Sequence, residues 1–379
     1  MTVITNELAL FQPGSKNYGI EECDYVSYRP SGQISNSSPI EFQISGTSSE
    51  YVLLSKTRLY VKVKVLKDDD DSAILPEHNV AFVNNAMHSL FRQVDVSLNQ
   101  QVVTATVGVN YPYKSLIDVL LNHGEGQTGR LMSSGYYKDQ AYAMDTIAGN
   151  SGHLMRKNLA QQGIVDFEGV LHVDIAQQPK AILNGVQIGV KLYQHDDSFR
   201  LISDGAKYKI AIDEAELKVC HLRVNPSIML AHSERLSKSP AIYPFFKSNI
   251  KTYTIPSGSY TWSIDDIFHG FVPQKILVAF VAADAYAGKL ELNPFNFFHY
   301  NCNYLEFAKD GRSIPATAFQ PKFELNPEAA GEYKHTGYIN DYLSIFKEDD
   351  DTSDGSFITR SDYAGMLVPI TLGVENFSI

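Results

Sequence analysis

The sequence is poor in cysteine. Only three occur among 379 residues, Cys23, Cys220 and Cys302. They are far apart, odd in number and without the spacing of metal ligands, so they indicate neither a disulfide framework nor a zinc site. This usage is typical of a protein made in a reducing, intracellular compartment.

Basic residues are also scarce relative to acidic ones. The chain has 32 Lys and Arg against 43 Asp and Glu, a net charge of −11. Because nucleic-acid affinity depends on clustered Lys and Arg that neutralise phosphates, this balance argues against direct sequence-specific or general binding of nucleic acid.

Long apolar runs are missing as well. None approaches the ~20 residues needed to span a bilayer, and the first residues, MTVITNELALFQPG, lack the basic and apolar regions of a signal peptide. We therefore expect synthesis in the cytoplasm, without secretion. The glycosylation patterns at Asn36 and Asn376 are then expected to be coincidental.

Catalytic motifs are absent. The sequence contains no H-E-x-x-H, G-x-S-x-G, Walker loop or C-x-x-C. Gly124–Gly129 spells G-x-G-x-x-G, but it follows a predicted helix and not a strand, which favours a flexible loop. His172 with Asp174, expected on one face of a strand, and His195-Asp196-Asp197 could supply metal ligands, but no second cluster accompanies them and a structural or surface role is favoured. We name no catalytic, cofactor-binding or metal residue and expect no enzyme and no cofactor.

Three further segments have two interpretations each. The acidic runs Asp68–Asp71 and Glu348–Asp351 are predicted to be solvated loops, with weak divalent-cation sites or an acidic outer rim as the alternative. Asn293–Tyr300 is dense in aromatic residues without basic residues between them. This favours packing or a protein contact over base stacking.

Short alternating segments are abundant. With 44% hydrophobic residues over 379 positions, the chain can bury two cores. Residues 1–38 are polar and without period, and we predict an arm that becomes ordered only on assembly. Strands and helices are predicted after it from periodicity and turn residues: strands at 40–44, 59–65, 165–175, 186–193 and 208–219, a hairpin at 94–105 around Asn99, and helices at 112–121 and 226–236.

The second half repeats the order of the first. Tyr253–Gly258 is matched with Phe42–Gly46, Ile276–Val281 with Leu59–Val65, and the hairpin Leu305–Arg312, turning at Asp310-Gly311, with the hairpin at Val94. A helix with Ile339, Tyr342, Leu343 and Phe346 on one face and a closing strand at Tyr363–Val374 are predicted next.

Many short strands, few helices and no alternation of strand and helix indicate antiparallel sandwiches. The predicted fold class is all-β: two tandem eight-stranded jelly-roll barrels, a double jelly roll with short inserted helices. The predicted domains are an N-terminal arm (1–38), a first jelly roll (39–224) and a second jelly roll with the connector helix (225–379).

Several segments carry a family likeness. Pro39–Phe42, Leu54–Val61, Val83–Asn99 and Tyr111–Tyr113 resemble the double jelly-roll major capsid proteins of Polinton/Maverick-type elements and related small DNA viruses. Shorter stretches extend the resemblance over nearly the whole chain: Leu183–Val186, Leu230–His232, Thr254–Gly258 and Asn293–Phe297.

The resemblance implies a major capsid protein that forms homotrimers of pseudo-hexagonal outline, which tile an icosahedral shell around a DNA genome. Its partners would be itself and minor capsid or penton proteins, and its location the virion. The sequence does not decide whether a membrane is among the partners. Alternatives are a jelly-roll amidase or hydrolase acting on glycans, a minor vertex protein, and a domesticated capsid-derived protein.

Overall fold

A computed structural model describes residues 19–46, 49–104, 111–123, 128–140, 143–259, 261–265, 267, 275–298, 300, 302, 304–309, 312–319, 344–347, 354–358, 365–367 and 370–378. All structural statements below concern these residues.

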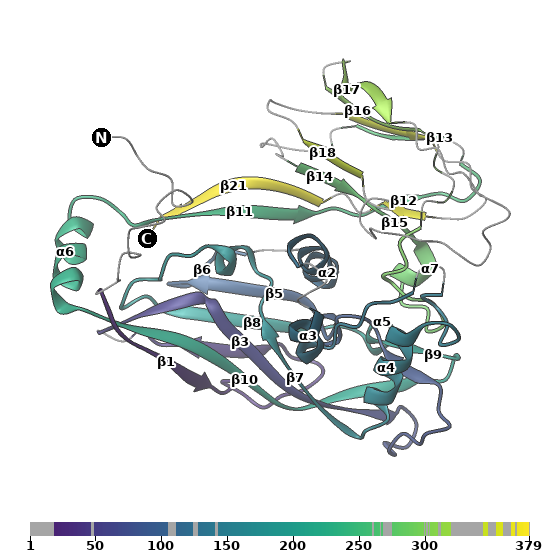
Figure 1. The fold of residues 1–379 in the computed structure, drawn as a ribbon, viewed down its shortest axis with the longest axis horizontal. Helices are drawn as coiled ribbons and strands as arrows, with labels where there is room; N and C mark the ends of the chain where they lie inside the picture. Colours follow the sequence, from purple (N-terminus) through teal and green to yellow (C-terminus); the bar gives the residue numbers. More distant parts are fainter. Residues whose placement is uncertain are drawn as a thin grey trace, which may run out of the picture.

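Eight strands of the first half form two antiparallel four-stranded sheets (Figure 1). The first sheet has the order β1 (Ile20–Tyr28), β10 (Tyr208–Val224), β3 (Glu50–Lys67) and β7 (Ile164–Val170). The second has the order β2 (Ile40–Ile44), β8 (Ile188–Gln194), β5 (Phe91–Leu98) and β6 (Gln101–Val102). Counted along the chain, the strands are joined as 1-8-3-6 and 2-7-4-5, the two Greek keys of a jelly roll.

Alternation explains why these segments form strands. In β3, Val61, Val63 and Val65 are buried in the core between the sheets. Lys62 and Lys64 point the other way and pair with acidic residues of β10 at 2.9 and 3.0 Å. Successive side chains of a strand face opposite sides, so this sequence gives one apolar and one charged face.

The second half has the same topology. One sheet has the order β11 (Ile242–Ile250), β21 (Ile370–Ser378), β14 (Lys275–Val278) and β18 (Ser344–Lys347); the other has β13 (Thr261–Ile264), β19 (Asp354–Ile358), β16 (Tyr304–Lys309) and β17 (Arg312–Phe319). Counted along the chain, these are again 1-8-3-6 and 2-7-4-5. The predicted double jelly roll is therefore confirmed by strand order in both halves.

Smaller elements connect the sheets. Two short ladders are formed by β4 (Val80–Phe82) with β9 (Leu201–Ser203), and by β12 (Tyr253–Ile255), β20 (Gly365–Leu367) and β15 (Phe280–Ala282). The helices are α1 (Ala86–Ser89), α2 (Tyr111–Asn122), α3 (Thr128–Leu131), η3 (Met132–Ser134), α4 (Ser151–Ala160), η4 (Asp174–Gln177), α5 (Asp197–Arg200), α6 (Pro226–Leu236) and α7 (Ala283–Tyr286).

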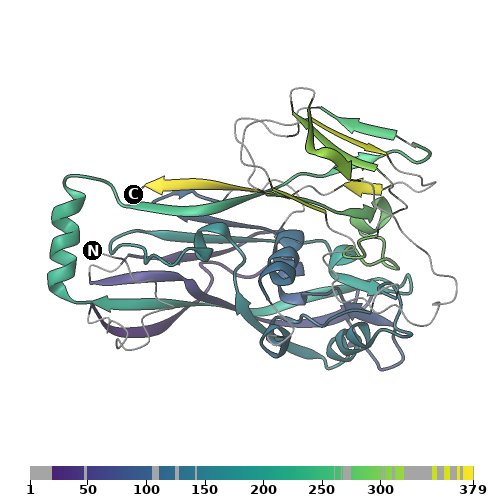
Figure 2. The same ribbon diagram turned by 45° about the horizontal axis from the view of Figure 1, so that its top comes forward.

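The predicted connector helix is confirmed as α6. Asn225 caps it by accepting a hydrogen bond from the Ser227 amide at 3.0 Å, and Pro226 occupies its first turn. Both views place α6 at one end of the molecule, between β10 and β11 (Figures 1 and 2). None of its residues is buried.

The prediction of an arm without regular structure is wrong for Ile20–Tyr28. This stretch is β1, which pairs with β10 from Ile20 opposite Val224 to Tyr28 opposite Leu217. The first jelly roll therefore begins before residue 39. Every residue from Ile20 to Ser27 is exposed, so the sequence has no apolar alternation to reveal the strand, because alternation reports burial and not pairing.

Other predictions need correction in detail. The strand predicted at 165–175 ends at Val170, and η4 follows; residues 171–175 are all buried, so their apolar spacing reflects packing. Phe346, predicted on one face of a helix with Ile339, Tyr342 and Leu343, lies instead in β18, which pairs with β14; residues 339–343 lie outside the described residues. The strand predicted at 363–374 is divided between β20 and β21.

One of the predicted matches between the two halves pairs the wrong strands. β12 joins the small ladder, and the second strand of the second barrel, the counterpart of β2, is β13. The match of Ile276–Val281 with β3 is right in order, although the strand breaks at Ala279 into β14 and β15. The matched hairpins are confirmed as β5–β6 and β16–β17, while the Asp310-Gly311 turn lies outside the described residues.

Candidate functional site

An apolar core joins the two barrels. It contains Val83, Tyr113, Leu116, Ile117, Phe199 and Ile202 from the first half and Ile250, Leu277, Ala279, Val281, Ala285 and Phe295 from the second. Tyr113 is central and fully buried. Its ring stacks on Tyr286 at 5.7 Å between centroids and meets the Phe295 ring edge-on at 5.4 Å, and its hydroxyl donates to the Pro294 carbonyl at 3.1 Å.

Polar contacts flank this core. The Asp145 carboxylate accepts from the Asn293 amide at 2.6 Å and from the Asn296 side chain at 2.8 Å. The Asn293 side chain donates to the Met144 carbonyl at 3.2 Å. The predicted packing role of the aromatic segment 293–300 is thus confirmed for Phe295, while His299 lies outside the described residues.

Strand β11 extends the joint along the first barrel, across which it runs together with β21 (Figure 1). Tyr243 and Phe245 are buried in the core of the first barrel. The Tyr243 hydroxyl accepts from the Leu183 amide at 3.2 Å, and Lys180 donates to the Ile242 carbonyl at 2.8 Å. These contacts and the shared apolar core join the two barrels along β11.

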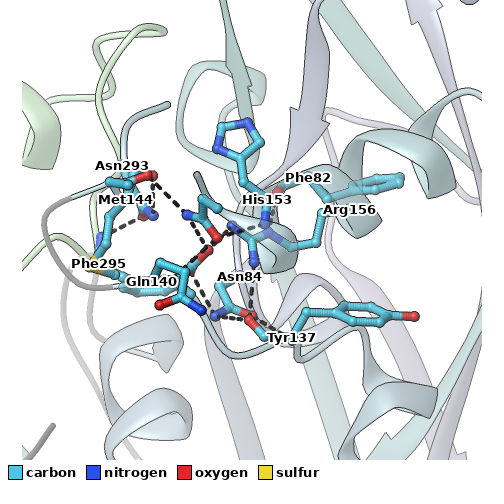
Figure 3. A network of polar contacts seen from close by, with 12 residues as sticks. Phe82, Asn84, Tyr137, Gln140, Met144, His153, Arg156, Asn293 and Phe295 are labelled. Atoms are coloured by element: carbon cyan, nitrogen blue, oxygen red, sulfur yellow. Dashed lines mark hydrogen bonds and ion pairs between the residues drawn. The ribbon is translucent and has the colours of Figure 1, made fainter. Parts of the chain in front are cut away.

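A buried ion pair organises the loop that contacts Asn293. Arg156 of α4 is fully buried and donates to Asp139 at 2.7 Å, to the Phe82 carbonyl at 2.9 Å and to the Tyr137 carbonyl at 3.1 Å (Figure 3). Asn84 donates to the other oxygen of Asp139 at 3.0 Å. A guanidinium fork can satisfy several acceptors at once, and Arg156 donates to three here.

The same network holds the segment 143–150. The Asn150 side chain donates to Asp139 at 2.9 Å and to the Ala143 carbonyl at 3.0 Å. Its carbonyl oxygen caps α4 by accepting from the His153 amide at 3.1 Å. Figure 3 shows Met144 and Asn293 beside this network. Arg156 therefore supports the contact between the barrels indirectly, because its network holds the loop that bears Met144 and Asp145.

His172 and Asp174 do come together, but not on a strand face. His172 lies in the irregular segment between β7 and η4, and Asp174 is the first residue of η4; both belong to a cluster around the buried amine of Lys114 on α2. Lys114 contacts Asp118 at 2.8 Å and Asp174 at 3.1 Å, and His172 lies 3.4 Å from Asp118. Asp174 also accepts from the Ser248 amide of β11 at 2.9 Å. A lysine ammonium occupies the space between the two carboxylates, so this cluster is a structural ion-pair site that also touches the second barrel.

Asp118 in this cluster and His88 beside it have shifted pKa values. Burial alone would raise the pKa of Asp118, but the Lys114 charge and the hydrogen bond with His172 lower it to about 2. Burial and the neighbouring His172 lower the pKa of His88 well below its ordinary value; the rings of His88 and His172 are 4.7 Å apart. At neutral pH the cluster holds an ionised carboxylate and a neutral His88.

His195-Asp196-Asp197 has a structural role too. The His195 ring stacks on Phe199 at 3.9 Å, and its Nδ1 accepts from the Asp196 amide at 2.8 Å. Burial, and then the charge of Arg200, lower its pKa to about 3. Asp197 pairs with Arg200 and accepts from the Ile210 amide at 2.9 Å, so the three side chains do not converge on one point.

The remaining segments singled out in the sequence have simple positions. Asp68–Asp71 form an exposed turn after β3, as predicted, and Asp71 pairs with Lys209 of β10. Glu348–Asp351 and Gly124–Gln127 of the glycine motif lie outside the described residues. Within the described ranges, no group of three or more His, Cys, Asp or Glu could hold a metal ion, and no helix has the length and apolar character needed to cross a membrane.

Exposed apolar side chains mark candidate contact surfaces on the outside. Leu230 of α6 is 73% exposed, and Phe246 of β11 is 57% exposed. A groove of about 370 Å³ lies beside α6, lined by Tyr51, Asn184, Pro226, Met229, Leu230, His232, Ser233 and Leu236. His232 stacks on Tyr51 and shares a hydrogen bond with its hydroxyl at 2.9 Å, which anchors the helix to β3.

Comparisons with known proteins agree with this topology. No protein-family model matches the chain. Among curated proteins it is 22% identical over 301 residues, 76% of this chain and 70% of the relative, to the uncharacterized protein F54H12.2 of Caenorhabditis elegans.

Among solved structures the chain is similar to a chain of the Sputnik virophage, with a TM-score of 0.59 at 11% identity, covering 100% of this chain and 92% of that one. It is similar to the Faustovirus major capsid protein (TM-score 0.58, 9% identity, 98% and 92% covered) and to a chain of the PBCV-1 virus capsid (TM-score 0.55, 10% identity, 97% of each). The chain thus has the double jelly-roll fold of viral major capsid proteins.

Proposed function

We propose that this chain is the major capsid protein of an icosahedral virus or virus-like element, and that it works by self-association without catalysis. The observation that carries the proposal is the pair of jelly rolls with identical strand order, joined by the apolar core around Tyr113. Three such bodies around an axis present six similar barrels, so a homotrimer acquires a pseudo-hexagonal outline suited to tiling a shell. The likeness in fold to the Faustovirus and PBCV-1 capsid chains supports this reading.

Exposed edges and apolar side chains fit the same proposal. β1 and β7 are the outer strands of their sheet, and uncovered edges template unwanted pairing unless another chain covers them. Neighbouring copies in a closed assembly supply that cover. The shell would enclose a DNA genome without gripping it, since the net charge is −11. Minor capsid or penton proteins are the expected further partners, the virion the location, and the host cytoplasm the site of synthesis.

The division into domains follows from the same proposal. We place the boundary between the jelly rolls near residue 224, where β10 ends and α6 begins. We place the start of the first jelly roll at β1 instead of at residue 39, where the sequence predicted it. The residues before β1 remain the proposed arm toward neighbouring capsomers, and deleting them should impair shell assembly while leaving the trimer intact.

Size-exclusion chromatography with light scattering tests the proposal. A stable species of three times the 42.2 kDa chain mass, with a pseudo-hexagonal outline in negative stain, is expected, and such trimers should assemble into shells. A clean monomer that persists as concentration rises would contradict the proposal and direct attention to assays of glycan hydrolysis.

A further inference from the structure

Two thiols meet across the ladder that closes the first barrel. The sulfur atoms of Cys23 and Cys220 lie 3.0 Å apart, although the residues are 197 positions apart in the chain, and both cysteines are free. In the register of β1 and β10, Cys23 is opposite Leu222 and Tyr25 is opposite Cys220. The two thiols are therefore diagonal neighbours on one face of the sheet.

Their surroundings differ in a way that suits stepwise oxidation. Cys23 is exposed on the edge strand. Cys220 is fully buried in a small apolar cluster with Tyr51, Leu222 and Val224. Burial, together with the hydrogen bond and charge of Cys23, raises the pKa of Cys220 to about 12. Only Cys23 is open to an external reagent, and Cys220 is placed to react with Cys23 alone.

We propose that Cys23 and Cys220 are a modification site that forms an intrachain disulfide in an oxidising environment, with a small-molecule disulfide such as oxidised glutathione as the oxidant. The Cys23 thiolate attacks one sulfur of the oxidant and releases one small thiolate. Cys220 gives up its proton and attacks the Cys23 sulfur of the mixed disulfide, releasing the second small thiolate. Two protein thiols are oxidised, one small disulfide is reduced to two thiols, and the two protons end on those thiols or in water.

The bond would join the first strand of the jelly roll to the last. β1 is exposed from Ile20 to Ser27, so its backbone ladder with β10 carries most of its attachment. A covalent link at Cys23 prevents the strand from peeling away. The inference does not depend on the proposed function; under that function, the bond would form after the particle leaves the reducing cell.

The test uses the purified full chain, treated with oxidised glutathione or with dithiothreitol, then digested under non-reducing conditions for mass spectrometry. We expect one linked peptide pair containing Cys23 and Cys220, lighter than its reduced parts by two hydrogen atoms, while Cys302 stays open to alkylation after unfolding. The oxidised chain should melt ~2–5 °C above the reduced one, and dithiothreitol should reverse both effects.

Two variants keep the test independent of folding. Cys23→Ser changes only an exposed side chain and should abolish the linked peptide and the melting shift. Cys302→Ser, the matched control, should retain both. The proposal is overturned if Cys23 stops as a mixed disulfide with glutathione, if it links instead to Cys302 or to a second copy of the chain, or if all three thiols remain reduced.

Discussion

The Arg156 guanidinium lies 2.7 Å from the Asp139 carboxylate, and the two side chains are 0% and 1% exposed. Removing one partner leaves the other charge buried and alone. Arg156→Met should therefore lower the free energy of unfolding by about 3–5 kcal/mol, measured by urea denaturation. Because the network supports the loop bearing Asp145, the variant should also weaken the contact with Asn293.

A surface pair provides the control for this prediction. Lys62 and Glu214 lie 2.9 Å apart but are 32% and 41% exposed. Lys62→Met should lower the free energy of unfolding far less than Arg156→Met does, because water and salt screen exposed pairs. Equal losses for the two variants would show that burial of Arg156 does not decide the energetics.

The joint between the barrels gives a second prediction. Tyr113→Ala removes a fully buried ring between the halves, which should cost about 3–5 kcal/mol and split thermal unfolding into two transitions by calorimetry. Tyr113→Phe keeps the ring and removes only the hydrogen bond to Pro294, at a cost of about 1–3 kcal/mol with one transition retained. A single transition in the alanine variant would contradict the role of this core in coupling the barrels.

Acid should destabilise the protein through buried histidines. The pKa of His195 is about 3 and that of His153 about 4 in the folded chain, against an ordinary value of 6.5. Below about pH 6.5 the unfolded chain therefore binds more protons than the folded chain. The free energy of unfolding should fall as the pH drops from about 6.5 toward 4, and these histidines should cause no pH dependence above 6.5.

The measurement is the urea midpoint between pH 7.5 and 4. His195→Gln removes one titrating group, so the fall should be shallower. Phe199→Leu, which removes the stacking partner but keeps the histidine, should lower stability at every pH and retain the slope. An unchanged slope in His195→Gln would refute the assignment.

Self-association should depend on the exposed face of α6. Leu230 is 73% exposed and no residue of this helix is buried, so Leu230→Asp should leave the melting temperature within a degree or so of wild type. Under the proposed self-association, we expect this variant to shift the trimer toward monomer in light scattering, because a charge would replace an apolar side chain at a contact between copies. Glu234→Gln on the same helix is the matched control and should assemble normally; trimers of undiminished stability in Leu230→Asp would remove α6 from the interface.

Burial patterns explain which parts of the fold were predictable. Val61, Val63 and Val65 alternate with lysines, and β3 was predicted from that alternation. β1 has no buried face and was missed. The repeat was recognisable from its hairpins, because a turn residue such as Asn99 marks the position of a turn whether or not its neighbours are buried. Asn99 has a φ of +48°, in the left-handed region.

The polar clusters were less accessible to sequence reasoning. Arg156 and Asp139 belong to separate segments, and no motif in the sequence links them. His172 and Asp174 were noted as a pair, but Lys114, which holds Asp174, comes from a distant helix. The contact between Cys23 and Cys220 could not be predicted without knowing that β1 and β10 are neighbours. That is a matter of sheet topology, which the local sequence pattern does not report.

Closure of each barrel by its first and last strands has a consequence for biosynthesis. The first barrel is complete when β10 has been made, at Val224, but the second needs β21, whose Ser378 pairs with Ile242. Until the ribosome has delivered that strand, β11 can rest only on the first barrel, through Tyr243 and Phe245. Folding of the second half therefore waits until β21 has been synthesised, and a nascent or truncated chain without β21 lacks the second of the two barrels that the proposed ring of six requires.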